Sequence, residues 1–361
     1  MNQMIDVNVN QLPVRTWNHL GMNEAVLRNI IAETQGNVSA EVPDEILDET
    51  EGRHADLNEI AAGMGEDLNR LLETGGIPTR SMTSPSGRKG TKPARLHFVY
   101  QDGEQAFNRI ALWAEKDSEL TVVMDFTSGD SAEKESVAGI QTKIYAGKDS
   151  LVRLVQIQRL GENVTFLNDI GSLCEAGARL EIVQLILNGQ NTYEGCKVKL
   201  AGEGSFFQAD VGYLVQKAEK LDMNYAAVHE GQRTKSGINV SGVLRDRAFK
   251  LFRGTIDFQT GSSGAEGEEK EDVLLLDDDV VNQTIPLILC AEEDVQGNHG
   301  ATVGKLDEEL LFYLESRGIS QKNIYEMMAQ ARLEAVCGKI PDEETRRQVQ
   351  AYLQGGQTDE D

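Results

Sequence analysis

Three stretches of similar sequence decide the fold: AGKDSLVRLVQIQ (residues 146–158), AGARLEIVQLILN (176–188) and AGEGSFFQADVGY (201–213). Each begins with Ala-Gly, passes through a short polar turn and ends in a run of residues typical of a β-strand. Their first residues, Ala146, Ala176 and Ala201, are 30 and 25 residues apart. A turn and a strand that recur at this spacing are typical of a β-solenoid, in which each coil stacks on the one before it.

Similar apolar stretches punctuated by Gly and Asn extend in both directions, from about Ala94 to His299. They include residues 96–100, 120–124, 151–157, 180–187 and 193–200. The absence of amphipathic helices between these stretches disfavours a Rossmann or TIM-barrel fold. A zone of about 200 residues predicts roughly eight coils, stacked over about 40 Å at the usual strand spacing. The repeats are imperfect, so the pattern also leaves a β-sandwich or jelly roll open.

The N-terminal flank, residues 1–93, is predicted to be mostly helical and to end in a linker. Apolar residues recur at helical spacing from Asn23 to Leu27 and from Asp56 to Glu73, before Gly75-Gly76. The stretch from Ser81 to Pro93 is rich in Ser, Gly, Pro, Arg and Lys, as linkers are. We therefore expect three regions, with boundaries at 1–93, 94–304 for the β core and 305–361.

The C-terminal region, 305–361, is predicted to form three helices. The first covers Leu306 to Arg317, the second runs from an N-cap at Ser320 to Val336, and the third runs from Pro341 to about Leu353. Acidic residues in the first turn and glycines after the ends support these limits. An acidic tail, Asp359 to Asp361, follows.

Composition narrows the function. The chain has 35 basic and 59 acidic residues, a net charge of −24, which argues against nucleic-acid or membrane-surface binding. Residues 1–10 have neither the basic residues nor the apolar core of a signal peptide, and no apolar run could span a bilayer. The four cysteines form no Cys-x-x-Cys pair, so we expect free thiols in a reducing, cytoplasmic setting.

One glycine-rich stretch resembles a phosphate-binding loop: GATVGK, residues 300–305. That motif needs four residues between its glycines and Ser or Thr after the lysine, whereas here there are three residues and Leu306. We therefore expect no nucleotide binding by this chain. His299, set among small residues just before a helix, is the better candidate, because a neutral imidazole is a good iron ligand. Local packing or capping is the alternative role for His299.

The C-terminal third resembles the SufB/SufD family of iron–sulfur cluster assembly proteins, and is closest to SufD. The resemblance rests on SGVLRDRAFKLFRGTIDF (241–258), on IPLIL (285–289) and above all on EDVQGNHGATVGKLDEELLFYLESRGIS (293–320). NQLPVRTWNHLGMNEA (10–25) adds a further match, and residues 26–95 match only loosely.

The resemblance implies a right-handed parallel β-helix between helical ends and a non-enzymatic role. It implies pairing with SufB, or with a second copy, through the β-helix ends, and binding of the SufC ATPase through the C-terminal helices. His299 falls on the family's HGAT histidine, which is implicated as a ligand of iron or of a transient iron–sulfur cluster. The family often has Cys two residues before this histidine, where the present chain has Gly297. A site built on His299 would therefore need cysteine ligands from a partner. Whether iron, sulfur or a whole cluster contacts the chain stays open.

The apolar residues of the C-terminal helices are the expected SufC contact. The candidates are Leu310, Leu311, Tyr313, Leu314, Met327 and Met328. Such Leu- and Met-rich helical faces suit a partner groove, although packing within the chain would also use them. Two other functions stay open: a SufB-like scaffold that works as a homodimer, and a β-helix enzyme acting on polysaccharide. The second is disfavoured by the low aromatic content of 6% and by the negative charge, which would repel acidic sugars.

Overall fold

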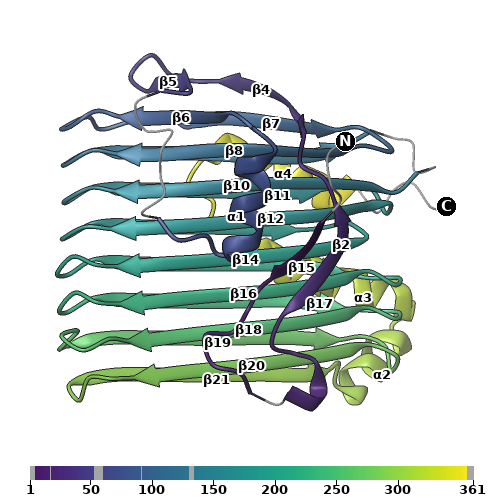
Figure 1. Cartoon of the computed structure of the whole chain (residues 1–361). Helices are drawn as coiled ribbons and strands as arrows, with labels where there is room; N and C mark the ends of the chain where they lie inside the picture. The colour runs from purple at the N-terminus through teal and green to yellow at the C-terminus, as the bar shows by residue number, and fades with distance from the viewer. Residues whose placement is uncertain (1–4, 17, 53–59, 91, 130–133, 356–361) are drawn as a thin grey trace.

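The computed structural model describes residues 5–16, 18–52, 60–90, 92–129 and 134–355. The chain is mainly β, and a β-solenoid of about eight turns spans residues 79–305 (Figure 1). This confirms the predicted solenoid and excludes the sandwich. None of the helices in the described part combines the length and the apolar character needed to span a membrane.

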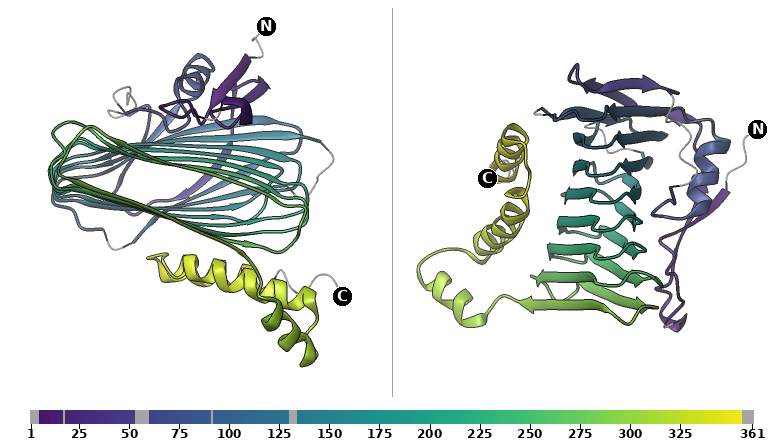
Figure 2. Two further views of the ribbon diagram at one scale, coloured as in Figure 1. Left: turned by 90° about the horizontal axis from the view of Figure 1, so that it is seen from below. Right: turned by 90° about the vertical axis from the view of Figure 1, so that its left-hand side faces the viewer.

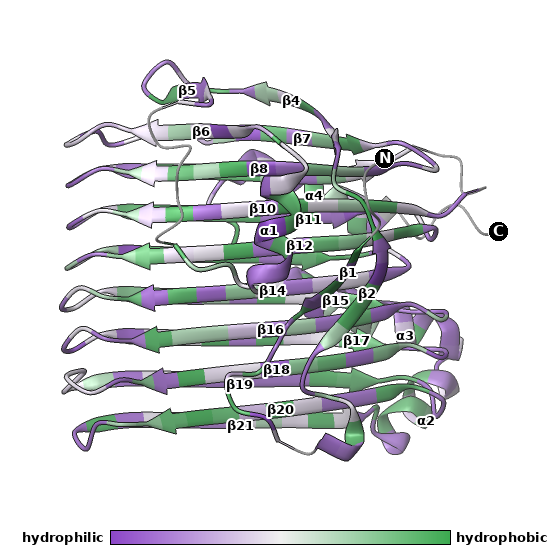
Figure 3. Ribbon diagram, in the orientation of Figure 1, coloured by the Kyte–Doolittle hydropathy of each residue, from purple (hydrophilic) through white to green (hydrophobic). Residues whose placement is uncertain are grey.

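Two sheets of parallel strands form the solenoid, and each coil of the chain contributes one strand to each sheet. The even sheet contains β6 (Thr79–Ser84), β8 (Gln105–Ala114), β10 (Ser136–Ala146), β12 (Val164–Cys174), β14 (Asn191–Leu200), β16 (Lys220–His229), β18 (Phe249–Phe258) and β20 (Val281–Cys290). The odd sheet contains β7 (Ala94–Tyr100), β9 (Glu119–Ser128), β11 (Leu151–Arg159), β13 (Arg179–Ile186), β15 (Phe206–Val215), β17 (Lys235–Leu244), β19 (Ala265–Leu275) and β21 (Val295–Lys305). Hydrophobic and hydrophilic residues are interspersed along the strands, as expected where one strand face lines a core (Figure 3).

The turns that lead from even to odd strands explain the repeated sequence. Asp117, Asp149, Gly177, Gly204 and Arg233 each occupy such a turn with φ between 54° and 68°. The backbone N–H of each donates to a carbonyl of the next turn, at 2.9 Å in all five cases. A residue that tolerates positive φ is therefore needed once per coil, and Gly or Asp meets this need at four of the five positions.

The two ends of the solenoid differ. At the N-terminal end, β4 (Asn37–Glu41) pairs antiparallel with β7, and β5 (Leu47–Thr50) pairs antiparallel with β6. Val38, Ala40, Val42 and Ile46 pack over the end of the core and cap it. At the other end, β20 and β21 are the last strands of their sheets in the described part of the chain. We call this the open end.

The outer faces of both sheets are covered (Figure 2). On the even sheet lie α1 (Glu66–Thr74) and the hairpin of β1 (Ile5–Val9) and β2 (Ala25–Ile30), whose apolar residues pack together with Leu167 of β12. On the odd sheet lie α3 (Gln321–Cys337) and α4 (Glu343–Gly355). Short two-residue strand β3 (Thr34–Gln35) pairs with β8.

The structure of the N-terminal region differs from the predicted mostly helical segment that ends in a linker. The helical spacing from Asn23 to Leu27 belongs largely to β2, because pairing with β1 outweighs local periodicity. The helix expected from Asp56 begins at Glu66 as α1, and residues 56–59 lie outside the described residues. The expected linker contains Ser81 to Ser84 of β6, which is the first strand of the solenoid, so the core begins before residue 94.

The C-terminal helices agree with the sequence. They are α2 (Glu308–Ser316), α3 and α4, and the side chain of Ser320 caps α3 by accepting the N–H of Asn323 at 3.3 Å. Arg95 of β7 anchors the start of α4 through Asp342 (2.9 Å). The predicted acidic tail, Asp359 to Asp361, lies outside the described residues.

A cluster of polar side chains is buried inside the solenoid. Glu194 accepts hydrogen bonds from Asn168 Nδ2 (2.8 Å) and Gln184 Nε2 (2.9 Å), and Gln156 bonds to both of these amides. Burial raises the pKa of Glu194 from 4.5 to about 8. The carboxyl group is therefore held protonated at neutral pH, which avoids an unpaired charge in the core.

Candidate functional site at the open end

His299 lies on β21, the last strand of the odd sheet, and is exposed. In the parallel register of β19 with β21, His299 lies beside Glu269 and Gly297 lies beside Gly267. Glu269 is buried while the adjacent Glu268 and Lys270 are exposed, so Glu269 points into the solenoid. Because side chains at one register position share a sheet face, His299 lies on the inner face of the last coil.

Gly297 lies on the same inner face. A Cβ placed at Gly297 would be 3.0 Å from the Phe258 ring and 3.2 Å from Ile288, both on the even sheet. A side chain at this position would thus point across the end of the solenoid. Gly297 is therefore next to His299 on the face that the open end exposes.

Cys290 ends β20 on the facing sheet. It lies beside Phe258 in the register of β18 with β20, and its thiol donates to the carbonyl of Glu292 at 3.0 Å. Cys290 is exposed, whereas Cys174, Cys196 and Cys337 are buried, and all four are free. Of the four cysteines, only Cys290 is therefore accessible from outside the protein.

Charged residues line the core just beneath the open end. Lys250 and Glu271 form a fully buried ion pair, and Thr284 donates to Glu271 at 2.7 Å. Burial raises the pKa of Glu269 to about 7, and the like charge of Glu271 adds to this effect. Burial also lowers the pKa of Lys250. The core therefore changes from apolar side chains to ionisable ones in the last two coils.

The open end does not hold a complete metal site by itself. Within the described part of the chain, no three His, Cys, Asp or Glu side chains gather closely enough to hold a metal ion. His299 is accordingly one available ligand, on an edge that a second protein could approach.

Helix α2, which follows β21, is the other exposed feature of this region. Its side chains are all exposed or half-buried, and Figure 2 shows it standing away from the solenoid. Phe312 is 73% exposed, Tyr313 51% and Leu310 40%, and Met327 of α3 is 52% exposed. Leu311, Leu314 and Met328 are half-buried, so only part of the predicted apolar set is available to a partner. Phe312, the most exposed of these residues, was missing from that set.

Comparison with known proteins agrees with this architecture. Residues 97–358 match the family described as SUF system FeS cluster assembly, SufBD core domain. The chain belongs to the SufBD family. It is 25% identical to the iron–sulfur cluster assembly protein SufD of Bacillus subtilis over 264 residues, 73% of this chain and 60% of that protein.

Other SufBD proteins are about equally similar. The iron–sulfur cluster assembly protein SufB of Bacillus subtilis is 25% identical over 75% of this chain and 59% of its own length. A SufBD family protein of Staphylococcus saprophyticus is 26% identical, with the same coverage. The chain thus spans about 60% of the length of these relatives. The SufBD membership expected from the HGAT stretch is confirmed.

Proposed function

We propose that this chain is a non-enzymatic, SufD-type subunit of an iron–sulfur cluster assembly complex. In this proposal its open end pairs with a second β-solenoid, either SufB-like or another copy, and its C-terminal helices bind the SufC ATPase. The observation that carries the proposal is the difference between the two ends of the solenoid, one capped by β4 and β5 and the other open.

An open solenoid end favours pairing with another protein. Repeat proteins need capped ends for solubility, and unpaired edge strands attract other strands. In this chain Val303 of β21 is 47% exposed and Val281 of β20 is 44% exposed. A partner that covered this end would bury both residues and would bring its own side chains to the inner face that carries His299.

His299 is then suited to bind cargo that the two subunits share. Iron accepts imidazole nitrogen, and thiolate ligands favour iron–sulfur clusters. This chain would offer His299, with Cys290 on the facing strand, while the partner would supply the remaining thiolates. The cluster is a product that the complex builds and passes on, so an incomplete site on each subunit would suit its release.

Helix α2 supports the proposed contact with the ATPase. Phe312, Tyr313 and Leu310 are apolar residues of α2 that the rest of the chain leaves exposed. Exposed aromatic residues on a helix are common anchors in protein interfaces. Nucleotide chemistry would thus come from the partner, in keeping with the failed match of residues 300–305 to a phosphate-binding loop.

Anaerobic co-purification tests the proposal. The full chain would be expressed with the Suf-type proteins encoded by the same genome, and the isolated complex analysed for subunits, visible absorbance, iron and sulfide. We expect an ATPase and a solenoid partner to co-purify, with iron and sulfide bound. Isolation of the chain without an ATPase and without iron would contradict the proposal.

A further inference from the structure

The N-terminal strap, residues 5–16 and 18–30, runs along the outer face of the even sheet to the open end (Figures 1 and 2). Its tip, residues 11–16 and 18–23, packs against the last two even strands. Leu12 and Met22 are buried in one cluster with Leu251 of β18 and Ile285 of β20. Because β20 is the last strand of its sheet, the strap tip lies at the rim of the open end.

A buried ion pair anchors the strap at this place. The guanidinium of Arg253 donates to the carbonyl of Met22 at 2.7 Å and to Asp222 Oδ1 at 2.6 Å. Asn10 Nδ2 donates to the same Asp222 oxygen at 2.7 Å. Arg253 is fully buried, so lifting the strap would leave its charge without one of its partners.

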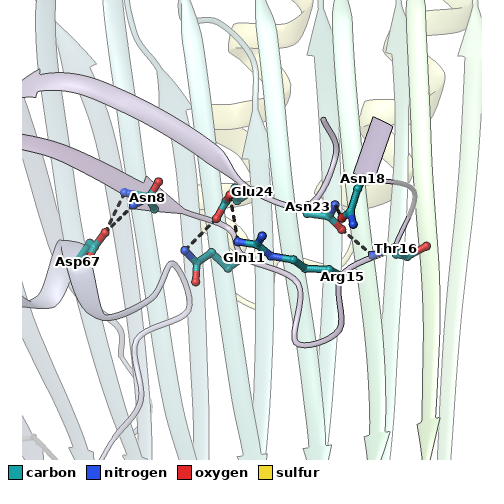
Figure 4. Close-up of polar contacts among 8 residues, drawn as sticks. All are labelled: Asn8, Gln11, Arg15, Thr16, Asn18, Asn23, Glu24 and Asp67. Atoms are coloured by element: carbon teal, nitrogen blue, oxygen red, sulfur yellow. Dashed lines mark hydrogen bonds and ion pairs between the residues drawn. The ribbon is translucent and has the colours of Figure 1, made fainter. Parts of the chain in front are cut away.

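The strap tip is also cross-linked internally (Figure 4). Asn23 accepts the backbone N–H of Thr16 at 2.8 Å and donates to Asn18 Oδ1 at 2.9 Å. Glu24 accepts hydrogen bonds from Gln11 at 3.1 Å and from Arg15 at 3.5 Å. These bonds hold an irregular loop in one shape without an apolar core of its own.

This ordered loop nevertheless exposes large apolar residues. Val14 is 49% exposed and Leu20 is 52% exposed, values similar to those of Val281 and Val303 on the last two strands. A loop that is already fixed loses little conformational freedom when a partner covers it. Exposed apolar side chains thus occur both on the last two strands and on the strap tip that packs against β18 and β20.

We propose that the strap tip is part of the surface against which a second copy of this chain docks end to end. This rests on the end-to-end pairing in the proposed function and extends it to residues outside the solenoid. A second copy fits because two identical open ends can close each other's edges about a twofold axis. Pro286 has no N–H to donate from β20, which limits continuous strand pairing and leaves side-chain contacts such as these to hold the pair.

The test compares variants by sedimentation velocity of the purified full chain. We expect the double variant Val14→Glu with Leu20→Glu to raise the dimer Kd at least ~10-fold, and Leu20→Ala alone to raise it by about threefold. Val26→Glu is the matched control, because Val26 lies on β2 of the same strap and is 50% exposed. The control should leave the dimer Kd unchanged, and thermal melting should be the same for all variants.

The outcomes separate this inference from the proposed function. Equal dimer Kd values for the wild type and the double variant would overturn the role of the strap tip. A wild-type chain that stays monomeric but pairs with another SufBD protein would overturn the second copy as occupant, while end-to-end pairing would stand. A chain that pairs with neither, and also co-purifies without an ATPase or iron, would overturn the proposed function as well.

Discussion

Asp222 and Arg253 form a bidentate ion pair beneath the N-terminal strap, with Nη1 to Oδ1 at 2.6 Å and Nη2 to Oδ2 at 3.2 Å. The two residues lie on neighbouring strands, β16 and β18. The side chain of Arg253 is fully buried, and that of Asp222 is 11% exposed. The pair thus links the solenoid to a segment more than two hundred residues earlier in the chain.

Removing one member of this pair should be strongly destabilising. We expect Asp222→Ala to lower the free energy of unfolding by about 3–5 kcal/mol, because it leaves the charge of Arg253 buried without a carboxylate. Urea unfolding followed by circular dichroism measures this. The control is Asp48→Ala, which breaks the bidentate but more exposed pair with Arg80 and should cost less than about 1 kcal/mol. Equal losses for the two variants would contradict this account.

Glu194 should make stability depend on pH. Its pKa is about 8 in the folded chain against an ordinary 4.5, so the folded state holds a proton that the unfolded chain releases. Its contribution is complete below pH 4.5 and is lost as the pH rises towards 8. Between pH 4.5 and about 8, the free energy of unfolding of the wild type should fall as the pH rises. In the Glu194→Gln variant this fall should be smaller by ~1.4 kcal/mol per pH unit. Parallel pH profiles for the wild type and the variant would show that Glu194 ionises normally.

His299→Ala should abolish cluster build-up in the purified complex and leave folding and ATPase binding intact. The side chain is exposed, so its loss removes a ligand without opening the core. Iron and sulfide analysis after anaerobic reconstitution, together with a melting curve, provides the readout. Asn298→Ala, also exposed but on the opposite face of β21, is the control. Normal cluster content in the His299 variant would exclude the proposed ligand role.

Gly297→Cys should add a thiolate beside His299 and raise the iron retained by the chain. The new Cβ would press on Phe258 and Ile288 at 3.0 and 3.2 Å, so we expect a stability loss of about 1 kcal/mol. Gly300→Cys supplies the same thiol on the other face of β21, where a Cβ meets open space. Similar iron retention by both variants would show that the inner face has no special role.

Phe312→Ala should weaken binding of the ATPase about tenfold or more if α2 forms the proposed contact. Stability should be unchanged, because Phe312 is 73% exposed. Titration calorimetry with the purified ATPase would measure the affinity. Leu47→Ala, at a residue that is 41% exposed on β5 of the capped end, is the control. Unchanged affinity of the Phe312 variant for the ATPase would show that the ATPase does not bind through Phe312.

The repeats predicted the solenoid because their physical cause is local. One turn residue per coil must adopt a positive φ. In the sequence this requirement is visible as a Gly or Asp in most of these turns, such as Asp149, Gly177 and Gly204. The C-terminal helices were predicted for an equally local reason, because Gly318 follows the end of α2 and Ser320 caps the start of α3. Residues 23–27 misled the prediction because β2 is stabilised by pairing with β1, a contact that its own periodicity does not record.

The site was only partly predictable for a similar reason. The HGAT stretch drew attention to His299, but its inner-face position depends on the register of β19 with β21. The exposure of Phe312 depends on α2 standing away from the solenoid. Which end of the solenoid is capped depends on the pairing of β4 with β7 and of β5 with β6. The position of the strap tip depends on its contacts with Asp222 and Arg253. Local sequence patterns record neither kind of long-range contact.

The strap has a consequence for the order of folding. Asn10 and the carbonyl of Met22 bind to Asp222 and Arg253, at separations of 212 and 231 residues. During synthesis the strap leaves the ribosome long before β16 and β18 exist, so it must wait until most coils are formed. Contacts between such distant residues form slowly. Docking of the strap should therefore be a late event that marks a completed solenoid, and would make the rim of the open end available for assembly only in chains whose coils are all in place.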